Sequence, residues 1–284
     1  MHNYKIGAMV ESFRLDTFEA IKRASEIGVD GLQMYCSHGE NAPENMSDSR
    51  KKDIIKAVKD SGLVFSAICG DLGHGFGDQE KNSALIEKSK RIIDLALELG
   101  TNIVTTHIGV VPSSPEIDRY KIMQSACFEL AEYAEGQGAR FAIETGPESS
   151  LTLKKFLDEI SSSGIAVNLD PANLAMVIGE SAVDAVHNLK DYIIHTHAKD
   201  GIKLFDMKPE YIYRVWETPE ELMNKTAFKE VPLGEGSVNF PMYLKALDEI
   251  GYKGFLTIER EVGQDPEKDI RTAYSFLKDI IANG

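Results

Sequence analysis

The chain has 284 residues and a formal charge of −14, from 31 basic and 45 acidic side chains. This acidic balance argues against a nucleic-acid-binding protein, because phosphate backbones are bound by clustered Lys and Arg. Hydrophobic residues make up 43% of the chain, which is enough for a large core. No apolar run reaches the length of about 18 residues that a membrane span needs, and the first residues lack the basic segment of a signal peptide.

The three cysteines, Cys36, Cys69 and Cys127, are widely spaced and form no Cys-x-x-Cys pair. Their odd number predicts buried thiols in a reducing compartment rather than a disulfide framework or a cysteine-rich zinc site. Together with the missing span and signal segments, this usage predicts a cytoplasmic protein.

Short runs rich in β-branched residues alternate with segments whose apolar residues recur at helical spacing. Eight strands alternating with helices predict one domain over residues 1–284, a (β/α)8 barrel of the TIM type. A doubly wound sheet is the alternative, but residues 10–13 lack its glycine-rich phosphate turn. We expect the strands at residues 4–10, 31–36, 64–70, 102–109, 140–146, 165–170, 193–200 and 254–261.

Helix ends carry their own signals. Asp16, three residues before Glu19, is typical of a helix N-cap, and Thr218 ahead of Pro219 and two glutamates predicts a second helix start. Six glycines follow predicted helices, and we expect them to adopt the left-handed conformation that ends a helix. They are Gly28, Gly62, Gly100, Gly138, Gly164 and Gly251.

The seventh and eighth predicted strands are separated by about 30 residues more than their neighbours. The surplus falls in residues 201–239, which contain the only tryptophan, Trp216. A segment that follows a barrel strand emerges at the C-terminal face, where active sites lie. A lid, a subunit contact in a homo-oligomer and an insertion without function are all compatible with this position.

Four consecutive predicted strands end in residues that can bind a metal ion: Glu144, Asp170, His197 and Glu259. Three carboxylates crowded at one rim would raise one another's pKa values unless a cation compensated them. Oxygen-rich coordination with one imidazole suits Mn²⁺, Mg²⁺ or Co²⁺, and Zn²⁺ is also compatible. The pattern therefore predicts one divalent metal ion, with Mn²⁺ as the first choice.

Longer motifs surround these residues. They are AIE at 142–144, NLDPAN at 168–173, HTHAKD at 195–200, PLGEG at 232–236 and GYKGFLTIE at 251–259. With them the chain resembles, over essentially its whole length, the sugar isomerase/epimerase family of xylose-isomerase-like TIM barrels. That superfamily includes ketose 3-epimerases, hydroxypyruvate isomerase, inosose dehydratase and endonuclease IV.

The resemblance implies that Glu144, Asp170, His197 and Glu259 bind the metal ion, and that Glu144 and Glu259 act as acid and base on opposite faces of the substrate. A metal that polarises a carbonyl and the adjacent hydroxyl stabilises a cis-enediolate. One carboxylate removes the neighbouring proton and the other returns one. We therefore expect an isomerase or 3-epimerase of a small ketose or related sugar.

The chain departs from the family pattern at two positions. Asn173 stands three residues after Asp170, where many relatives have His, and Gln33 replaces a frequent acidic residue of the second strand. We expect Asn173 and His107 to contact the substrate, as well as Lys199 and His38, which lie on or after strands at the same rim.

Other polar residues have simpler interpretations. An ion pair of Lys199 with Asp200 or Glu235 is the alternative to its substrate contact. His195 shares the parity of His197 one layer deeper, so we expect it to be buried and hydrogen-bonded. His2 and His187 are expected to be exposed to solvent.

Three alternatives to an isomerase or epimerase stay open. A metal-dependent dehydratase of an inosose-like or dehydroshikimate-like polyol ketone would use the same metal and base. A DNA-repair enzyme like endonuclease IV needs further His ligands, but residues 201–239 contain no histidine. A non-catalytic sugar-binding barrel would not need the full set of four ligands. The expected partner is a small sugar or polyol ketone, with no nucleic acid and no membrane.

Overall fold

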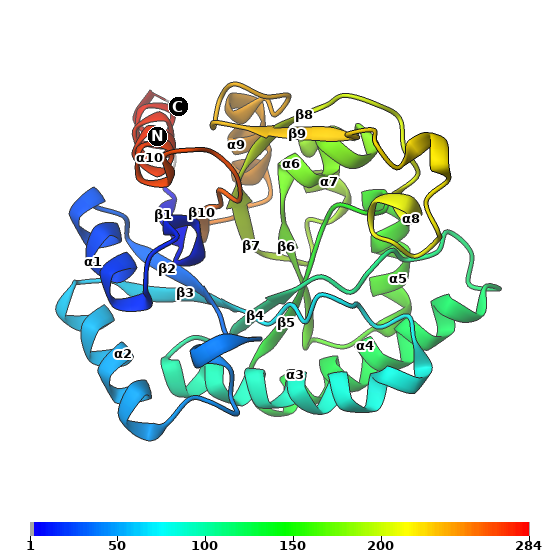
Figure 1. Cartoon of the computed structure of the whole chain (residues 1–284), viewed down its shortest axis with the longest axis horizontal. Helices are drawn as coiled ribbons and strands as arrows, with labels where there is room; N and C mark the ends of the chain where they lie inside the picture. Colours follow the sequence, from blue (N-terminus) through cyan, green and yellow to red (C-terminus); the bar gives the residue numbers. More distant parts are fainter. Residues whose placement is uncertain (1–2, 284) are drawn as a thin grey trace.

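A computed structural model describes residues 3–283, so His2 lies outside the described residues. Eight parallel strands close into a barrel in the order β1-β10-β7-β6-β5-β4-β3-β2 (Figure 1). The predicted (β/α)8 barrel is confirmed, and every barrel strand falls within a predicted range. The strands are β1 Lys5–Met9, β2 Gly31–Tyr35, β3 Val64–Cys69, β4 Ile103–Thr106, β5 Arg140–Glu144, β6 Ile165–Leu169, β7 Ile193–Ala198 and β10 Phe255–Ile258.

Helices surround the barrel and connect its strands (Figure 1). All five residues of β6 are buried, as expected of a strand that is covered on both faces. The helices are α1 Thr17–Ile27, α2 Asp48–Asp60, α3 Gln79–Leu99, α4 Asp118–Gly136, α5 Ser150–Ile160, α6 Pro171–Asn173, α7 Ala182–Asn188, α9 Phe240–Glu249 and α10 Pro266–Asn283. Single turns are η1 Glu11–Phe13, η2 Gly39–Asn41 and the π-helical η3 Leu174–Ile178.

Most of the predicted helix signals are confirmed. The Asp16 side chain accepts hydrogen bonds from the N–H groups of Phe18 and Glu19 at the start of α1. Five of the six glycines have positive φ, as predicted. Gly164 was predicted wrongly, because Ser161 takes the left-handed position after α5. Gly164 is needed instead for close packing on α4, where an added Cβ would lie 1.9 Å from the Ala131 carbonyl oxygen.

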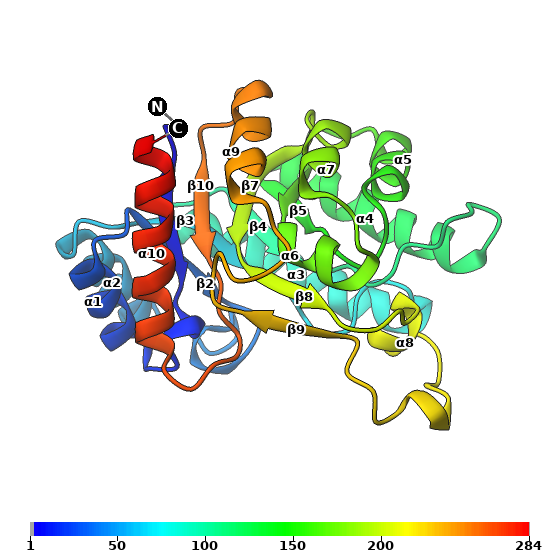
Figure 2. The ribbon, with the colours of Figure 1, turned by 90° about the horizontal axis from the view of Figure 1, so that it is seen from above.

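The surplus between β7 and β10 contains an antiparallel hairpin, β8 Asp200–Lys203 with β9 Phe228–Val231. Figure 2 shows this hairpin and the short helix α8 Pro209–Ile212 beyond the C-terminal ends of β7 and β10. The helix start predicted at Thr218 was wrong. Only the single turn η4 Glu220–Leu222 forms there, without a side-chain cap, and the Thr218 hydroxyl donates to the Tyr211 carbonyl at 3.4 Å.

The cysteines and His187 have the burial that the sequence predicts. All three cysteines are buried free thiols, as predicted. The His187 side chain is 45% exposed and lies 3.4 Å from a Glu249 oxygen. Over residues 3–283, no helix combines the length and the apolarity that crossing a membrane requires.

Candidate metal centre

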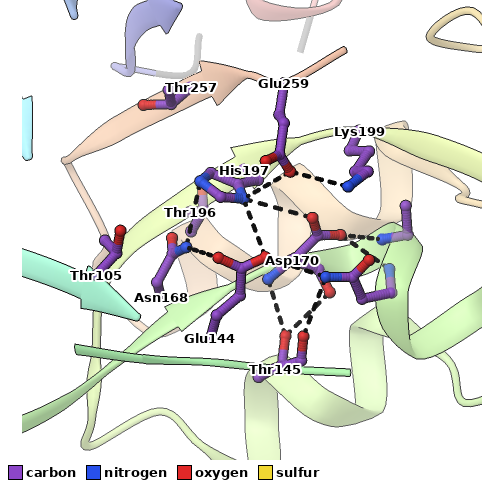
Figure 3. A network of polar contacts seen from close by, with 12 residues as sticks. Thr105, Glu144, Thr145, Asn168, Asp170, Thr196, His197, Lys199, Thr257 and Glu259 are labelled. Atoms are coloured by element: carbon purple, nitrogen blue, oxygen red, sulfur yellow. Dashed lines mark hydrogen bonds and ion pairs between the residues drawn. The ribbon is translucent and has the colours of Figure 1, made fainter. Parts of the chain in front are cut away.

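Four buried side chains converge at the C-terminal ends of β5, β6, β7 and β10, which are neighbours in the barrel. Glu144 is the last residue of β5, Asp170 and Glu259 directly follow β6 and β10, and His197 lies within β7. One nitrogen or oxygen atom from each lies within 4.8 Å of the others. In Figure 3 the four side chains point toward one another. The sequence prediction that these residues share one rim is confirmed.

The histidine sits among the three carboxylates. Nδ1 of His197 lies 3.2 Å from Glu259, 3.4 Å from Asp170 and 3.6 Å from Glu144, measured to carboxylate oxygens. Burial alone would lower the pKa of His197, but the carboxylates raise it well above its ordinary value. A buried imidazolium among carboxylates is therefore what this cluster holds when no other cation is bound.

The carboxyl groups respond differently to this environment. Burial would raise the pKa of Glu144, but His107 and His197 hold it below its ordinary value. Burial is likewise outweighed at Glu259, where Lys199 and His197 hold the pKa well below the ordinary value. Burial dominates at Asp170 and raises its pKa. Asp170 is thus the carboxyl with the most to gain from an additional positive charge.

Two atoms of the cluster test whether a metal ion would fit. Oδ2 of Asp170 and Nδ1 of His197 are buried and have no hydrogen-bond partner. They lie 3.4 Å apart in an ion pair, which neutralises charge without supplying a hydrogen bond to either atom, and both atoms face the centre of the cluster. Oxygen atoms with one imidazole nitrogen form a donor set that hard divalent cations accept. The residues present therefore fit a divalent metal ion.

Gln33 fixes the orientation of His197 from the opposite side of the ring. Nε2 of Gln33 donates to the Thr105 hydroxyl at 2.8 Å, which directs its Oε1 toward Nε2 of His197 at 3.0 Å. Oε1 is only an acceptor, so this contact, the shorter of the two at Nε2, requires a proton there. The Asn168 Nδ2, at 3.2 Å from the same nitrogen, then donates to Glu144 and not to the ring. The lone pair of the neutral ring then lies on Nδ1, the atom that faces the carboxylates.

A second amide, Asn168, supports the cluster from below. Its Nδ2 donates to Glu144 Oε2 at 3.1 Å, and its Oδ1 lies 2.8 Å from Nδ1 of His195. Burial and the neighbouring His197 lower the pKa of His195 well below its ordinary value, so the ring is neutral. Its Nε2 lies 3.0 Å from the Thr257 hydroxyl. The prediction of a buried, hydrogen-bonded His195 is confirmed.

Asn173 and Asp170 are joined by a short helix turn. Oδ1 of Asp170 accepts the N–H groups of Ala172 and Asn173 at 2.8 and 2.9 Å, which leaves Oδ2 directed at the cluster. The Asn173 amide donates to Glu144 Oε1 at 3.0 Å and to the Thr145 carbonyl at 3.3 Å. Asn173 therefore orients a carboxylate of the cluster, and a substrate contact of this residue stays a prediction.

Lys199 is buried beside Glu259. Its Nζ lies 3.0 Å from Glu259 Oε2 and 2.5 Å from Glu261 Oε2. The predicted alternative, a pair with Asp200 or Glu235, was wrong, because Lys199 pairs with Glu259 and Glu261 instead. Both oxygens of Asp200 accept backbone N–H groups. Burial would lower the pKa of Lys199, but Glu259, Asp170 and Glu261 raise it well above its ordinary value, so Lys199 is an ammonium.

His107 follows β4 and borders the cluster. Its Nε2 lies 3.4 Å from Glu144 Oε1, and its Nδ1 lies 3.6 Å from Asp71 Oδ2. Burial opposes the charged form, but Glu144 and Asp71 raise the pKa of His107 to about 10. The side chain is 28% exposed, so it borders both the cluster and the open mouth of the barrel.

His38 lies farther out than the other predicted site residues. It is exposed, its ring is 5.5 Å from the Tyr35 ring, and it lines a rim pocket with Glu40 and Arg50. The structure does not bring it to the four-residue cluster.

Charges of the cluster and its neighbours act on two further residues, Tyr213 and Glu148. Tyr213 of the insertion has a raised pKa, first through burial, and the charges of Lys199, Glu144 and Glu148 act on its hydroxyl. Burial raises the pKa of Glu148 to about 8, and one of its oxygens accepts the Val111 N–H at 3.1 Å. The insertion thus brings one aromatic hydroxyl within electrostatic reach of the cluster.

The orienting roles of Gln33 and Asn168 are not predicted by the sequence motifs. Gln33 stands out there only as a departure from the family pattern, and Asn168 only as part of the NLDPAN motif. A polar amide in the middle of an otherwise apolar strand is the signal that identifies both, since an unpaired buried amide is unfavourable.

Comparisons with known proteins place this geometry in a family. A profile described as "Xylose isomerase-like TIM barrel" matches residues 21–280. An uncharacterised Methanocaldococcus jannaschii protein, MJ1311, is 26% identical over 76% of this chain and 70% of its own length. The Haemophilus influenzae protein named putative L-ribulose-5-phosphate 3-epimerase SgbU is 22% identical over 98% of this chain and 96% of its own.

Solved structures share the fold over nearly the whole chain. A xylose isomerase domain protein from Planctomyces limnophilus has a TM-score of 0.79 at 24% identity and covers 100% of this chain and 99% of its own. A D-tagatose 3-epimerase-like protein has a TM-score of 0.74 at 19% identity, covering 98% and 99%. The probable 3-DHS dehydratase AsbF from Bacillus anthracis has a TM-score of 0.75 at 19% identity, covering 96% and 98%.

Proposed function

The chain belongs to the xylose isomerase-like TIM barrel family, and we propose that it is a divalent-metal-dependent isomerase or 3-epimerase of a small ketose or related sugar. The observation that carries this proposal is the buried group of Glu144, Asp170, His197 and Glu259, with two atoms at its centre that have no hydrogen bond. The relatives and structural neighbours named as epimerases support it.

The four residues would hold the metal ion, for which Mn²⁺ is our first choice and Mg²⁺, Co²⁺ and Zn²⁺ are alternatives. When bound, such an ion supplies positive charge that polarises the carbonyl and the adjacent hydroxyl of a ketose. Gln33 keeps the Nδ1 lone pair of His197 available for it.

Glu144 and Glu259 are the proposed acid and base. They come from β5 and β10, with β6 and β7 between them in the barrel, so they reach a shared substrate from opposite sides. A pKa held below the ordinary value keeps each carboxylate ionised and able to accept a proton from the carbon next to the carbonyl. The carboxyl that receives the proton, or its counterpart on the other face, returns one to the substrate.

Neighbouring residues complete the proposed site. Lys199 holds Glu259 in place through a 3.0 Å contact and can donate to a substrate oxygen. His107 lies at the mouth, where its second role would be to bind a substrate hydroxyl, and Asn173 orients Glu144. We propose that residues 201–239 act as a lid, which Tyr213 supports because its hydroxyl feels the charges of the cluster.

A metal-dependent dehydratase is the second candidate, and the fold neighbour named as a probable 3-DHS dehydratase favours keeping it. The same base would remove the proton, and hydroxide would then leave from the β-carbon. An endonuclease-like function is disfavoured by Asn173, which stands where many relatives have His, and by a cluster that contains one histidine, His197.

Incubating the Mn²⁺-loaded protein with a panel of ketoses in deuterated water separates the candidates. An isomerase or epimerase should incorporate deuterium at the carbon next to the carbonyl without loss of water, whereas a dehydratase should release water. No exchange and no dehydration with any ketone, at full metal occupancy, would contradict both functions. Cleavage of abasic DNA in Zn²⁺ would support the endonuclease.

A further inference from the structure

In the loops beyond β7 and β10, backbone N–H groups converge on carboxylates of the protein itself. From this we propose that the substrate is an uncharged polyhydroxy ketone and not a sugar phosphate. The inference rests on the function proposed above and narrows the substrate of the same site. It separates this chain from the relative named for a ribulose 5-phosphate.

The first internal carboxylate is Asp200, at the start of β8. Its Oδ2 accepts the N–H groups of Gly234 and Gly236 at 3.0 and 2.9 Å. Its Oδ1 accepts those of Gly201 and Val238 at 2.9 and 3.1 Å. Four converging N–H groups form the kind of concavity that binds anions, and barrel enzymes frequently bind phosphate with the loops after their last two strands.

The fit around Asp200 is too close for a second anion. Asp200 is 1% exposed, and a Cβ added to Gly236 would lie 2.1 Å from its Oδ1. The glycines of the PLGEG motif are therefore explained by an internal carboxylate, which fills the concavity that these N–H groups form and leaves none of them for a substrate anion.

The loop after β10 is filled in the same way. The buried Glu230 of β9 accepts the N–H of Glu261 at 3.2 Å and binds the Arg260 guanidinium at 2.6 Å. Asp265 accepts the N–H of Lys268 at 3.1 Å in the first turn of α10. Backbone donors and the helix dipole at this end of the barrel are thus directed at the protein's own carboxylates.

The side-chain cations next to the cluster are also neutralised. Lys199 contacts two carboxylates, Glu259 and Glu261, and His107 lies between Glu144 and Asp71. A phosphate dianion would have to compete with these carboxylates, and like-charge contacts strongly disfavour a partner.

Cations farther out have other contacts. Arg50 pairs with Glu40 at 3.0 Å, and Lys203 pairs with Asp206 at 2.6 Å. On the insertion, Lys208 and Lys225 lie over the rings of Trp216 and Phe205. The guanidinium of Arg119 packs against Gly77 and donates to the Val110 carbonyl, so it braces two rim loops.

What remains at the mouth favours hydroxyl groups. Asp71 supplies carboxylate oxygens beside His107, with Oδ2 at 3.6 Å from its Nδ1. Carboxylates accept the O–H donors that a polyol presents along its length. An uncharged ketose satisfies these acceptors without bringing a second negative charge among them.

The test compares matched pairs of substrates with the Mn²⁺-loaded full chain: L-ribulose against L-ribulose 5-phosphate, and D-fructose against D-fructose 6-phosphate. The readout is kcat/KM for deuterium exchange next to the carbonyl. We expect at least one free ketose to exceed its phosphate ester by about 100-fold or more. Inorganic phosphate should not inhibit exchange of the free ketose.

The outcomes separate this inference from the proposed function. Exchange that is equal or faster with the phosphate esters would overturn the inference and leave the isomerase or epimerase proposal standing. No exchange with either member of any pair would contradict the proposed function, and the inference would fall with it.

A charge variant sharpens the test. Glu261→Gln removes one of the two carboxylates from Lys199, so the ratio of phosphate-ester to free-ketose kcat/KM should rise by roughly 3–10-fold. Glu132→Gln makes the same change of net charge on the exposed face of α4 and should leave the ratio unchanged. An unchanged ratio in Glu261→Gln would contradict the argument from Lys199.

Discussion

Asp170 and Asp200 are two fully buried aspartates near one end of the same barrel, and their surroundings differ in one respect. Both oxygens of Asp200 are saturated by four backbone N–H groups. Asp170 uses Oδ1 to cap a helix turn, and its Oδ2 has no hydrogen bond and only a 3.4 Å ion pair with His197. Burial and residue type are the same, so the oxygen without a hydrogen bond distinguishes a carboxylate that can receive a ligand from one that holds loops together.

The largest expected effect concerns the four-residue cluster that contains Asp170. Glu259→Gln keeps the size of the side chain and removes the proposed acid or base, so kcat should fall by about 10²–10⁴-fold. Circular dichroism should show an unchanged fold, and metal content should be verified by elemental analysis. The exposed Glu132→Gln is the matched control, and retained turnover in Glu259→Gln would eliminate this residue as acid or base.

The two aspartates can be separated by stability. In Asp200→Asn, the new amide NH2 group replaces one carboxylate oxygen and faces backbone N–H groups that need an acceptor. The metal-free protein should therefore lose about 2–5 kcal/mol in its free energy of unfolding. Asp170→Asn keeps an oxygen for the helix cap and removes a buried negative charge, so it should lose little or gain stability. Denaturant melts of both variants check this. Equal losses would show that the comparison between the two aspartates is mistaken.

Glu148 is an intermediate case, with one hydrogen bond from Val111 and a pKa raised by burial to about 8. The folded protein binds this proton more tightly than the unfolded chain, whose glutamates titrate near about pH 4.3. The stability that the protonated group supports is therefore lost as the pH rises from about 4 to about 8.

Glu148→Gln removes this titration and keeps an acceptor for the Val111 N–H. The variant should become more stable than the wild type as the pH rises from about 5 to about 8, by roughly 2–4 kcal/mol, and the difference should then level off. Parallel denaturant melts across this range measure it. A difference that does not change with pH would mean that Glu148 is not held neutral by burial.

The smallest effect concerns the orientation of His197. Gln33→Leu removes the acceptor that fixes its Nε2 proton, so affinity for Mn²⁺ should fall by about 10–100-fold while the fold is retained. Gln33→Glu, which keeps an acceptor at this position, is the control and should bind at least as tightly as the wild type. Unchanged affinity in Gln33→Leu would remove the proposed role of this amide.

The fold and the four convergent residues could be predicted because their signals are local. Alternating strand and helix patterns define the barrel, and parity along a strand places Glu144 or His197 at the rim. The Gly164 prediction failed because nothing local distinguishes a helix stop from a close contact with α4.

The supporting contacts could not be predicted, since they join residues far apart in the chain. Gln33 meets His197 across 164 positions, and Asp200 meets a loop that lies more than thirty residues later. The prediction of the Lys199 partners was wrong for the same reason. The nearest carboxylate in sequence, Asp200, accepts backbone N–H groups, whereas the distant Glu259 contacts Lys199.

Calorimetric titration of the metal-free protein with Mn²⁺ tests the central claim most directly, with the wild type beside Asp170→Asn and Asp200→Asn. We predict that the wild type and folded Asp200→Asn each bind one ion per chain, and that Asp170→Asn loses this binding while keeping its fold. A wild type that binds no divalent ion, or an Asp170→Asn variant that binds as tightly as the wild type, would contradict the assignment of the metal centre.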